Sequence, residues 1–308
     1  MTLRARFPDL RHRLEALGLL LLLGPLRLLP IDFSSNLGGW LGRTLGPRLG
    51  IARRARRSLS LALPDLSAPD REAILVAMFD NLGRTAFEYP HLGKITDPAS
   101  GRVTVKDYQL IEAAVTQGRG LILFSGHLAN WEVLPLMAAR EGLELLSIVR
   151  QPNNPYVQGA IDRLRGVAGG QRVGKGAKGA RAAIQRLREG GNLALLCDQK
   201  MNNGIPTRFF GLPAMSPPAA AQLALRFGAP LVPVRIERLG PARFRLSCLP
   251  SLTLPENGRR DDNVQAATQA INDQLEAWIR ARPAEWLWLH KRWAKELYAT
   301  PAPPGRDG

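Results

Sequence analysis

The sequence predicts an α/β fold whose mostly parallel central sheet is flanked by helices and preceded by a membrane-associated helical segment. From Val103 onward, short apolar runs of strand length alternate with longer segments of helical periodicity, and this alternation is typical of a parallel sheet covered on both faces. Before that point the chain is rich in leucine and arginine and has no strand-like alternation. We therefore predict an N-terminal helical region at 1–100 and an α/β domain at 101–308.

The expected elements of the α/β domain follow from apolar run length and periodicity. Strands are expected at Gly120–Phe124, Leu143–Val149, Leu193–Cys197, Leu231–Ile236 and Phe244–Leu249. Helices are expected at Trp131–Arg140, Tyr156–Val167, Ala177–Glu189, Pro217–Phe227 and Asn263–Arg282.

Charge is concentrated in the N-terminal region. The chain carries a formal net charge of +16, which favours an anionic partner but says nothing about the fold. Up to Ser60 there are eleven arginines and no lysine against three acidic residues, so this fifth of the chain holds half of the net charge. Arginines that flank leucine-rich sequence suit an anionic membrane surface better than a nucleic-acid groove. No nucleic-acid-binding motif is present, so nucleic acid is not an expected partner.

An uncharged leucine-rich run from Ala16 to Leu26 is the candidate membrane segment. It is shorter than the roughly 20 apolar residues of a clean span, so we expect a helix that lies in or dips into the bilayer, with Arg27 reaching towards water. A buried core helix is the alternative. A secretory signal is disfavoured because no small-residue cleavage site follows. Another helix is expected to begin near Ser67, with Pro69 in its first turn.

The two cysteines, Cys197 and Cys248, follow apolar runs and have no metal-ligand spacing. We expect buried free thiols in a reducing compartment rather than a disulfide. No second histidine or cysteine stands at ligand spacing from the most informative histidine, so no metal is expected there.

That histidine, His127, lies where a buried strand gives way to a helix. The stretch Gly120–Glu132 reads as a strand, a Ser-Gly-His turn and a helix start, with Asn130 as a competent N-cap. Open α/β folds keep their chemistry at this edge of the sheet. Glu132, five residues after the histidine, is expected to fold back and orient it. The pair is interpreted as a base with an orienting acid, although a structural His–Glu pair has the same pattern.

Two further polar residues end expected strands at the same edge. Arg150 follows the strand Leu143–Val149, and Asp198 follows Leu193–Cys197. Because the carboxyl ends of parallel strands meet at one edge, His127, Glu132, Arg150 and Asp198 are expected to converge there.

A glycine-rich stretch at 169–179 imitates two nucleotide-binding motifs. The match to the P-loop motif has Gly176 where a magnesium-binding Ser or Thr is needed. The match to the G-x-G-x-x-G motif lacks the buried strand that should precede it. We interpret it as a flexible cationic loop whose Lys175, Lys178 and Arg181 meet phosphate or an acidic carrier.

The segment Ser125–Glu132 resembles the His-x-x-x-x-Glu motif of the lipid A biosynthesis (lauroyl/myristoyl-type) acyltransferases, relatives of the glycerolipid acyltransferases. The resemblance extends in order over roughly residues 100 to 295, and Ala129 departs from it where the family commonly has Gly. Its other matching segments are Val149–Pro155, Arg163–Arg165, Asp198–Gln199, Phe209–Gly211, Ala229–Pro233 and Trp286–Trp293.

The resemblance implies a glycerolipid-acyltransferase-like fold and transfer of a fatty acyl group from a thioester to a lipid hydroxyl. His127 would be the general base and Glu132 its partner. The remaining candidates for oxyanion or substrate binding are Arg150, Arg165, Asn130, Asp198 and Lys175. His290 is interpreted as a structural residue of a tryptophan-rich segment.

The implied partners are acyl carrier protein or acyl-CoA as donor, and a lipid A precursor or another membrane glycolipid as acceptor. The location implied is the cytoplasmic face of the inner membrane, and no cofactor is required. Three alternatives stay open: a lysophospholipid acceptor, an aminolipid acceptor, and a catalytically inactive lipid-binding relative.

Overall fold

The structure, a computed structural model, describes residues 8–149, 154–165, 170–255 and 258–299. Its helices are α1 (Pro8–Leu23), α2 (Ile31–Leu45), α3 (Ala52–Ala62), α4 (Ala68–Glu88), α5 (Leu92–Ile95), α6 (Gln109–Val115), α7 (Val133–Arg140), α8 (Pro155–Arg165), α9 (Ala177–Arg188), α10 (Ala219–Phe227), α11 (Arg260–Ala281) and α12 (Lys295–Ala299). Its strands are β1 (Val103–Lys106), β2 (Ile122–Ser125), β3 (Leu145–Val149), β4 (Gln171–Gly174), β5 (Asn192–Leu196), β6 (Ile205–Phe209), β7 (Leu212–Ser216), β8 (Leu231–Gly240) and β9 (Arg243–Cys248).

Within these residues the central sheet has the strand order β1-β9-β8-β2-β5-β3-β4. The strands from β8 to β4 run parallel to one another, while β9 pairs antiparallel with β8 and parallel with β1. A separate antiparallel hairpin is formed by β6 and β7. The predicted α/β fold with a mostly parallel, helix-flanked sheet is therefore confirmed.

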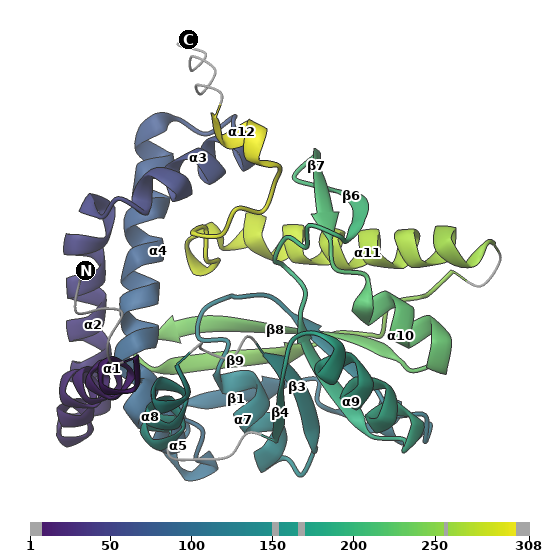
Figure 1. Ribbon diagram of the computed structural model, residues 1–308, viewed down its shortest axis with the longest axis horizontal. Helices are drawn as coiled ribbons and strands as arrows, with labels where there is room; N and C mark the ends of the chain where they lie inside the picture. The colour runs from purple at the N-terminus through teal and green to yellow at the C-terminus, as the bar shows by residue number, and fades with distance from the viewer. Residues whose placement is uncertain (1–7, 150–153, 166–169, 256–257, 300–308) are drawn as a thin grey trace.

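Alternate residues of the central strands face two different helical layers, as the period of a strand requires. Phe124 of β2 stacks on Trp278 of α11, and α9, α10 and α11 cover this face of the sheet (Figure 1). The neighbouring residue Leu123 faces α7 and α8, where it lines a pocket together with Leu134 and Ile161. The pocket thus lies between the sheet and the α7–α8 layer.

The N-terminal helices are an integral part of this structure. Buried side chains of α3 and α4, among them Leu59, Leu75 and Met78, belong to one continuous core with the strands β2, β5 and β8. In Figure 1, α2 and α4 stand side by side along one edge of the sheet. The division of the chain into two regions at residue 100 stays a prediction.

Glycines explain how α2 and α4 approach each other so closely. A Cβ on Gly42 of α2 would lie 2.0 Å from the carbonyl oxygen of Phe79, and one on Gly83 of α4 would lie 2.1 Å from the carbonyl oxygen of Gly38. Only residues without a side chain allow this backbone contact. The glycine-punctuated N-terminal sequence therefore encodes helix-to-helix packing.

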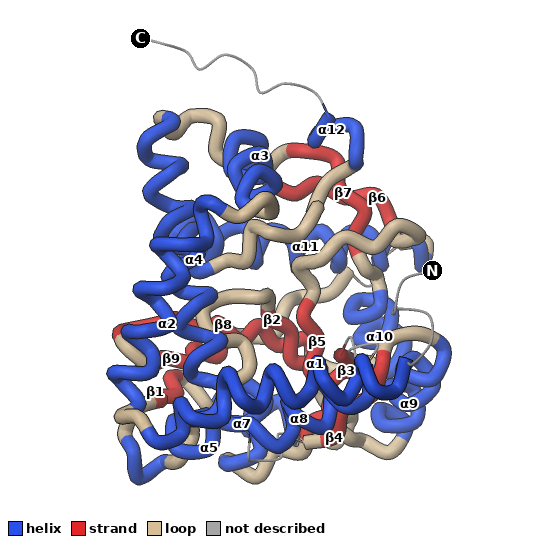
Figure 2. The backbone as a smooth tube through the Cα atoms, turned by 60° about the vertical axis from the view of Figure 1, so that its left-hand side comes forward, coloured by secondary structure: helices blue, strands red, loops and turns tan. Residues whose placement is uncertain are grey.

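The leucine-rich run predicted to be a membrane segment forms α1 and the 3₁₀ turn Gly24–Leu28. Within the described ranges, no helix has the length and apolarity needed to cross a bilayer. In Figure 2, α1 lies across the front of the molecule beside α8, with which it packs.

The ten expected elements of the α/β domain are present with ends that shift by at most three residues, except that β8 extends four residues further, to Gly240. The helix expected near Ser67 is also present, and the Ser67 hydroxyl accepts a hydrogen bond from the Asp70 N–H. The glycine-rich stretch is the main correction. Residues Gln171–Gly174 form the edge strand β4, where we predicted a flexible loop. An edge strand pairs on one side alone and tolerates polar residues, so its sequence carries little apolar signal.

Candidate active site

The site is built where two neighbouring parallel strands end. Ser125 of β2 lies opposite Leu196 of β5, and the N–H of Cys197 donates to the carbonyl of Ser125 at 2.9 Å. His127 and Asp198 each follow two residues after these partners. The pairing of the strands therefore brings together two residues that are 71 positions apart in the chain.

Asp198 holds the imidazole of His127. Its Oδ1 is 2.8 Å from Nδ1 of His127, and its Oδ2 accepts the backbone N–H of His127 at 2.9 Å and the indole N–H of Trp286 at 2.7 Å. Burial alone would raise the pKa of Asp198, but attraction to His127 and these hydrogen bonds hold the pKa far below its usual range. The carboxylate is thus ionised, Nδ1 is the donor, and Nε2 is left to accept a proton.

Glu132 does not have the predicted orienting role. Its Oε2 lies 3.3 Å from Nη2 of Arg172 on β4, and its side chain faces the same pocket as His127. The helix begins at Val133, two residues later than expected, and the orienting acid comes from a neighbouring strand. The assignment of Glu132 as the partner of His127 Nδ1 is therefore wrong, and Asp198 takes this place instead of a substrate-binding one.

Asn130 is also reassigned, because its side chain is fully buried. Its Nδ2 donates to Glu88 at 2.9 Å, and its Oδ1 accepts the N–H of Glu132 at 3.3 Å. Both ends of the amide are engaged within the protein. Asn130 therefore shapes the turn that carries His127 and is not placed to bind a substrate.

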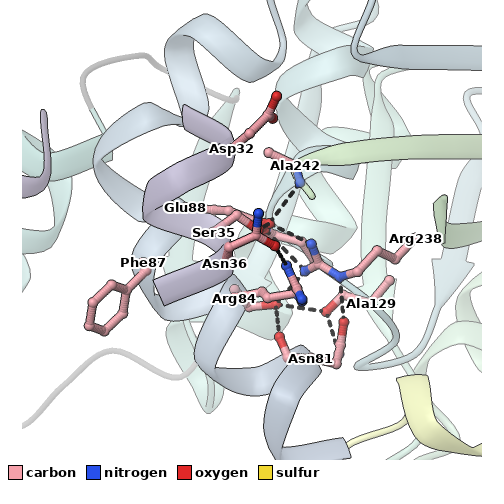
Figure 3. A network of polar contacts seen from close by, with 12 residues as sticks. Asp32, Ser35, Asn36, Asn81, Arg84, Phe87, Glu88, Ala129, Arg238 and Ala242 are labelled. Atoms are coloured by element: carbon pink, nitrogen blue, oxygen red, sulfur yellow. Dashed lines mark hydrogen bonds and ion pairs between the residues drawn. The ribbon is translucent and has the colours of Figure 1, made fainter. Parts of the chain in front are cut away.

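The buried ion pair between Glu88 and Arg238 anchors this turn to the N-terminal helices (Figure 3). Glu88 also accepts hydrogen bonds from Ser35 of α2 at 2.7 Å and from the backbone N–H of Ala242 at 3.2 Å. Arg238 reaches Asn81 at 2.7 Å. Burial would raise the pKa of Glu88, but the guanidinium of Arg238 and the other donors keep it below its ordinary value.

Ala129 has a left-handed backbone conformation with φ of 45°, which is costly for a residue with a side chain. Its carbonyl accepts hydrogen bonds from Asn81 at 3.2 Å and Thr85 at 3.0 Å, and its N–H donates to the carbonyl of Glu285 at 2.9 Å. These bonds from α4 and the C-terminal segment hold the turn in place. The left-handed φ at Ala129 is a conformation that glycine adopts without strain.

The histidine faces a cavity of about 280 Å³. Leu123, Ser147 and Ala194 form part of a mainly apolar floor on the sheet, and α7 and α8 form the opposite wall. The charged and amide side chains that line the cavity, together with its two histidines, are His127, Glu132, Gln158, Arg172, Lys175, Gln199 and His290, and those of His127, Lys175 and Gln199 follow the carboxyl ends of strands. The cavity can hold an apolar chain whose reactive end meets His127.

The other predicted site residues are only partly placed. Lys175 follows β4 and lines the cavity, as expected for a cationic residue near the site. Arg150 lies outside the described residues. Arg165 ends α8, but its side chain also lies outside them.

Arg172 of β4, Gln199 and His290 line the cavity and were not predicted as site residues. Gln199 follows Asp198 and contacts both histidines, and His290, interpreted from sequence as structural, has its ring centroid 5.6 Å from that of His127. Burial lowers the pKa of His290, and a positive charge on His127, when that ring is protonated, lowers it further. The position of Gln199 directly after a strand-end aspartate was a usable signal. The tryptophans around His290 led to its interpretation as a structural residue.

Cys197, next to Asp198, is not a candidate nucleophile. Both cysteines are buried free thiols, as predicted. Burial raises the pKa of Cys197 to about 12, so its thiol stays protonated at neutral pH.

The fold and the site define a class of protein in which a histidine base, held by a buried carboxylate, faces a mainly apolar cavity. A family model described as bacterial lipid A biosynthesis acyltransferase matches residues 5–295. The chain belongs to this family of acyltransferases.

Individual relatives are distant and have more than one acceptor in their names. The phosphatidylinositol mannoside acyltransferase of Mycolicibacterium smegmatis is 25% identical over 314 residues, covering 96% of this chain and 97% of the relative. That of Mycobacterium tuberculosis H37Rv is 25% identical over 264 residues, covering 81% and 79%. Lipid A biosynthesis acyltransferase 2 of Shigella flexneri is 25% identical over 161 residues, covering 51% and 49%.

Replacing Glu88 by Gln should lower the free energy of unfolding by about 3–5 kcal/mol, because Arg238 then stays buried without its counter-charge. Urea denaturation followed by circular dichroism measures this. Since the folded-state pKa of Glu88 is lowered, the wild-type contribution is present at neutral pH and is lost as the pH falls through that lowered value.

The matched control is Glu72→Gln. Glu72 pairs with Arg56, and the two side chains are 43% and 41% exposed, so its loss should cost less than about 1 kcal/mol. Equal losses in the two variants would contradict the anchoring role of Glu88.

Proposed function

We propose that the protein transfers a fatty acyl group from an acyl thioester to a hydroxyl group of a lipid A precursor. The observation that carries this proposal is the pairing of His127 with Asp198, which leaves Nε2 free of a proton beside a mainly apolar cavity. Membership in an acyltransferase family supports the reaction type. The apolar floor suits an acyl chain, and the polar end suits the reacting groups.

The reaction needs a base because a hydroxyl is a poor nucleophile at neutral pH. Nε2 of His127 takes the hydroxyl proton as the oxygen attacks the thioester carbonyl, and Asp198 stabilises the imidazolium that forms. The tetrahedral intermediate then collapses and the carbon–sulfur bond breaks. The imidazolium returns its proton to the departing thiolate, so the products are an ester and a free thiol.

The cations at the polar end of the cavity support phosphate-bearing substrates. Arg172 and Lys175 line this end, and Arg is well suited to bidentate contacts with phosphate. Acyl carrier protein is the proposed donor, because an acidic carrier would be steered to a chain with a net charge of +16. Acyl-CoA is the alternative donor, and its phosphates would meet the same cations.

A second acceptor class, phosphatidylinositol mannosides, is favoured by a specific observation. The mycobacterial relatives with that name align over most of this chain, whereas the Shigella lipid A relative aligns over about half of it. The chemistry is the same for both acceptors. Each acceptor is a phosphate-bearing glycolipid, and the same histidine base would activate its hydroxyl.

We further propose that the protein acts at the cytoplasmic face of the inner membrane, with α1 lying in the membrane surface. Leu10, Leu14, Leu17 and Leu21 recur at helical spacing and are 50–67% exposed, so they form an apolar stripe on one side of α1. Arginines on the same helix suit anionic lipid headgroups. Since α1 packs beside α8, this arrangement places the cavity wall next to the lipid.

The reaction is tested by release of free thiol from acyl-CoA and from acyl carrier protein in the presence of each glycolipid. His127→Ala should lower the rate at least about a thousandfold, because no other group replaces the base. Mass spectrometry of the lipid product identifies the acceptor by the added acyl mass. Thiol release by the variant at the wild-type rate would contradict the proposal, and lipid binding without any thiol release would favour an inactive lipid-binding protein.

Membrane association is tested by flotation with phosphatidylglycerol-containing vesicles. Changing Leu14, Leu17 and Leu21 together to Ser should reduce the bound fraction several-fold, since the buried apolar area is lost. Leu239→Ser, which changes a leucine that is 47% exposed on β8, is the control and should float like the wild type. Unchanged flotation of the triple variant would exclude the α1 stripe as the contact.

A further inference from the structure

The side chain of Gln199 lies between the two histidines of the cavity. Its Nε2 is 3.2 Å from Nε2 of His127 and 3.1 Å from Nε2 of His290. Gln199 immediately follows Asp198, so one short segment after β5 contacts both ring nitrogens of His127: Asp198 at Nδ1 and Gln199 at Nε2. The reactive nitrogen of the base is therefore already occupied in the free protein.

The direction of these hydrogen bonds follows from what each group can donate. An amide nitrogen carries two N–H donors and cannot accept, so each imidazole presents an unprotonated Nε2 to Gln199. For His127 this agrees with Nδ1 donating to Asp198. If the amide were reversed, its oxygen would require a proton on Nε2 as well, and His127 would then be a cation. The orientation of Gln199 is thus coupled to the protonation of the base.

The charged groups around this cluster come from several elements. Asp198 lies on one side of His127, and Glu132 with Arg172 lines the same cavity. Lys175 also faces the cavity, and Arg54 of α3 donates to the carbonyl of Leu289, next to His290. Burial and these cations disfavour a positive charge on the imidazole of His290, which agrees with its lowered pKa.

We propose that Gln199 is a positioning residue that keeps Nε2 of His127 a proton acceptor and marks the place of the acceptor hydroxyl. This rests on the proposed function. A hydroxyl also donates a hydrogen bond to Nε2, so it replaces the amide N–H without reversing the bond. The amide moves aside when the acceptor lipid enters, and it returns when the product leaves. The free base is therefore never left with a protonated Nε2 in the resting site.

Gln199→Glu tests this, because the variant places a carboxylate where an N–H donor stood at nearly the same size. An anion beside the two imidazoles favours their protonated forms. The pH at which His127 titrates, followed by NMR of ¹⁵N-labelled histidine, should rise by about one pH unit or more. The acid limb of the kcat/KM profile should move up with it, while activity recovers at higher pH.

Two further variants separate charge from shape. Gln199→Leu removes the N–H that favours an unprotonated Nε2 but adds no charge, so the acid limb should move up by less than in Gln199→Glu, and the rate should fall at every pH. Gln117→Glu adds the same charge at an exposed position and should change neither profile. The proposal is overturned if Gln199→Glu leaves the titration of both histidines unchanged, or if it lowers the rate equally at all pH values.

The NMR titration needs no acyl substrate. A wrong reaction assignment would appear as full thiol release by His127→Ala, whereas a wrong role for Gln199 would appear as an unmoved histidine titration. The two failures are therefore distinguishable.

Discussion

The buried carboxylate of Asp198 is the interaction on which the site depends. It receives hydrogen bonds from the backbone and ring of His127 and from the indole of Trp286, so it joins the end of β5, the turn after β2 and the C-terminal segment. The same segment also pairs with the turn through the backbone, where Leu287 donates to the carbonyl of His127 at 3.2 Å. A carboxylate that is buried stays ionised only with such donors. Asp198 consequently fixes both the position and the tautomer of the base.

A second buried charge connects this site to the N-terminal helices. Glu88 of α4 binds Arg238 of β8, Ser35 of α2 and Asn130 of the turn. From the sequence, the N-terminal helices were expected only to precede the α/β domain. In the structure they hold the turn that carries His127. This gives α2 and α4 a structural role in addition to any contact with lipid, and it explains why their glycines permit such close packing.

The sequence was sufficient for the features that depend on local pattern. Apolar runs and helical periodicity located β2, β3, β5 and β8, and the strand-end position identified His127. It failed where contacts join distant segments. Glu132 was chosen as the partner of His127 because it is five residues away, but the partner is set by the pairing of β2 with β5. Asn130 was read as a site residue because its burial against Glu88, 42 positions away, has no local signature. The short strands β1, β4, β6 and β7 were not predicted, and β4 is polar and lacks the apolar run by which the five predicted strands were found.

The most direct test compares Asp198→Asn with Glu132→Gln in the thiol-release assay, with thermal unfolding to confirm that both variants fold. Asp198→Asn keeps the shape of the side chain but cannot stabilise the imidazolium or fix its tautomer, so kcat should fall about a thousandfold or more. Glu132→Gln should cause a clearly smaller loss, because Glu132 pairs with Arg172 and does not hold Nδ1 of His127. Near-wild-type turnover by Asp198→Asn, with activity abolished in Glu132→Gln, would contradict the account.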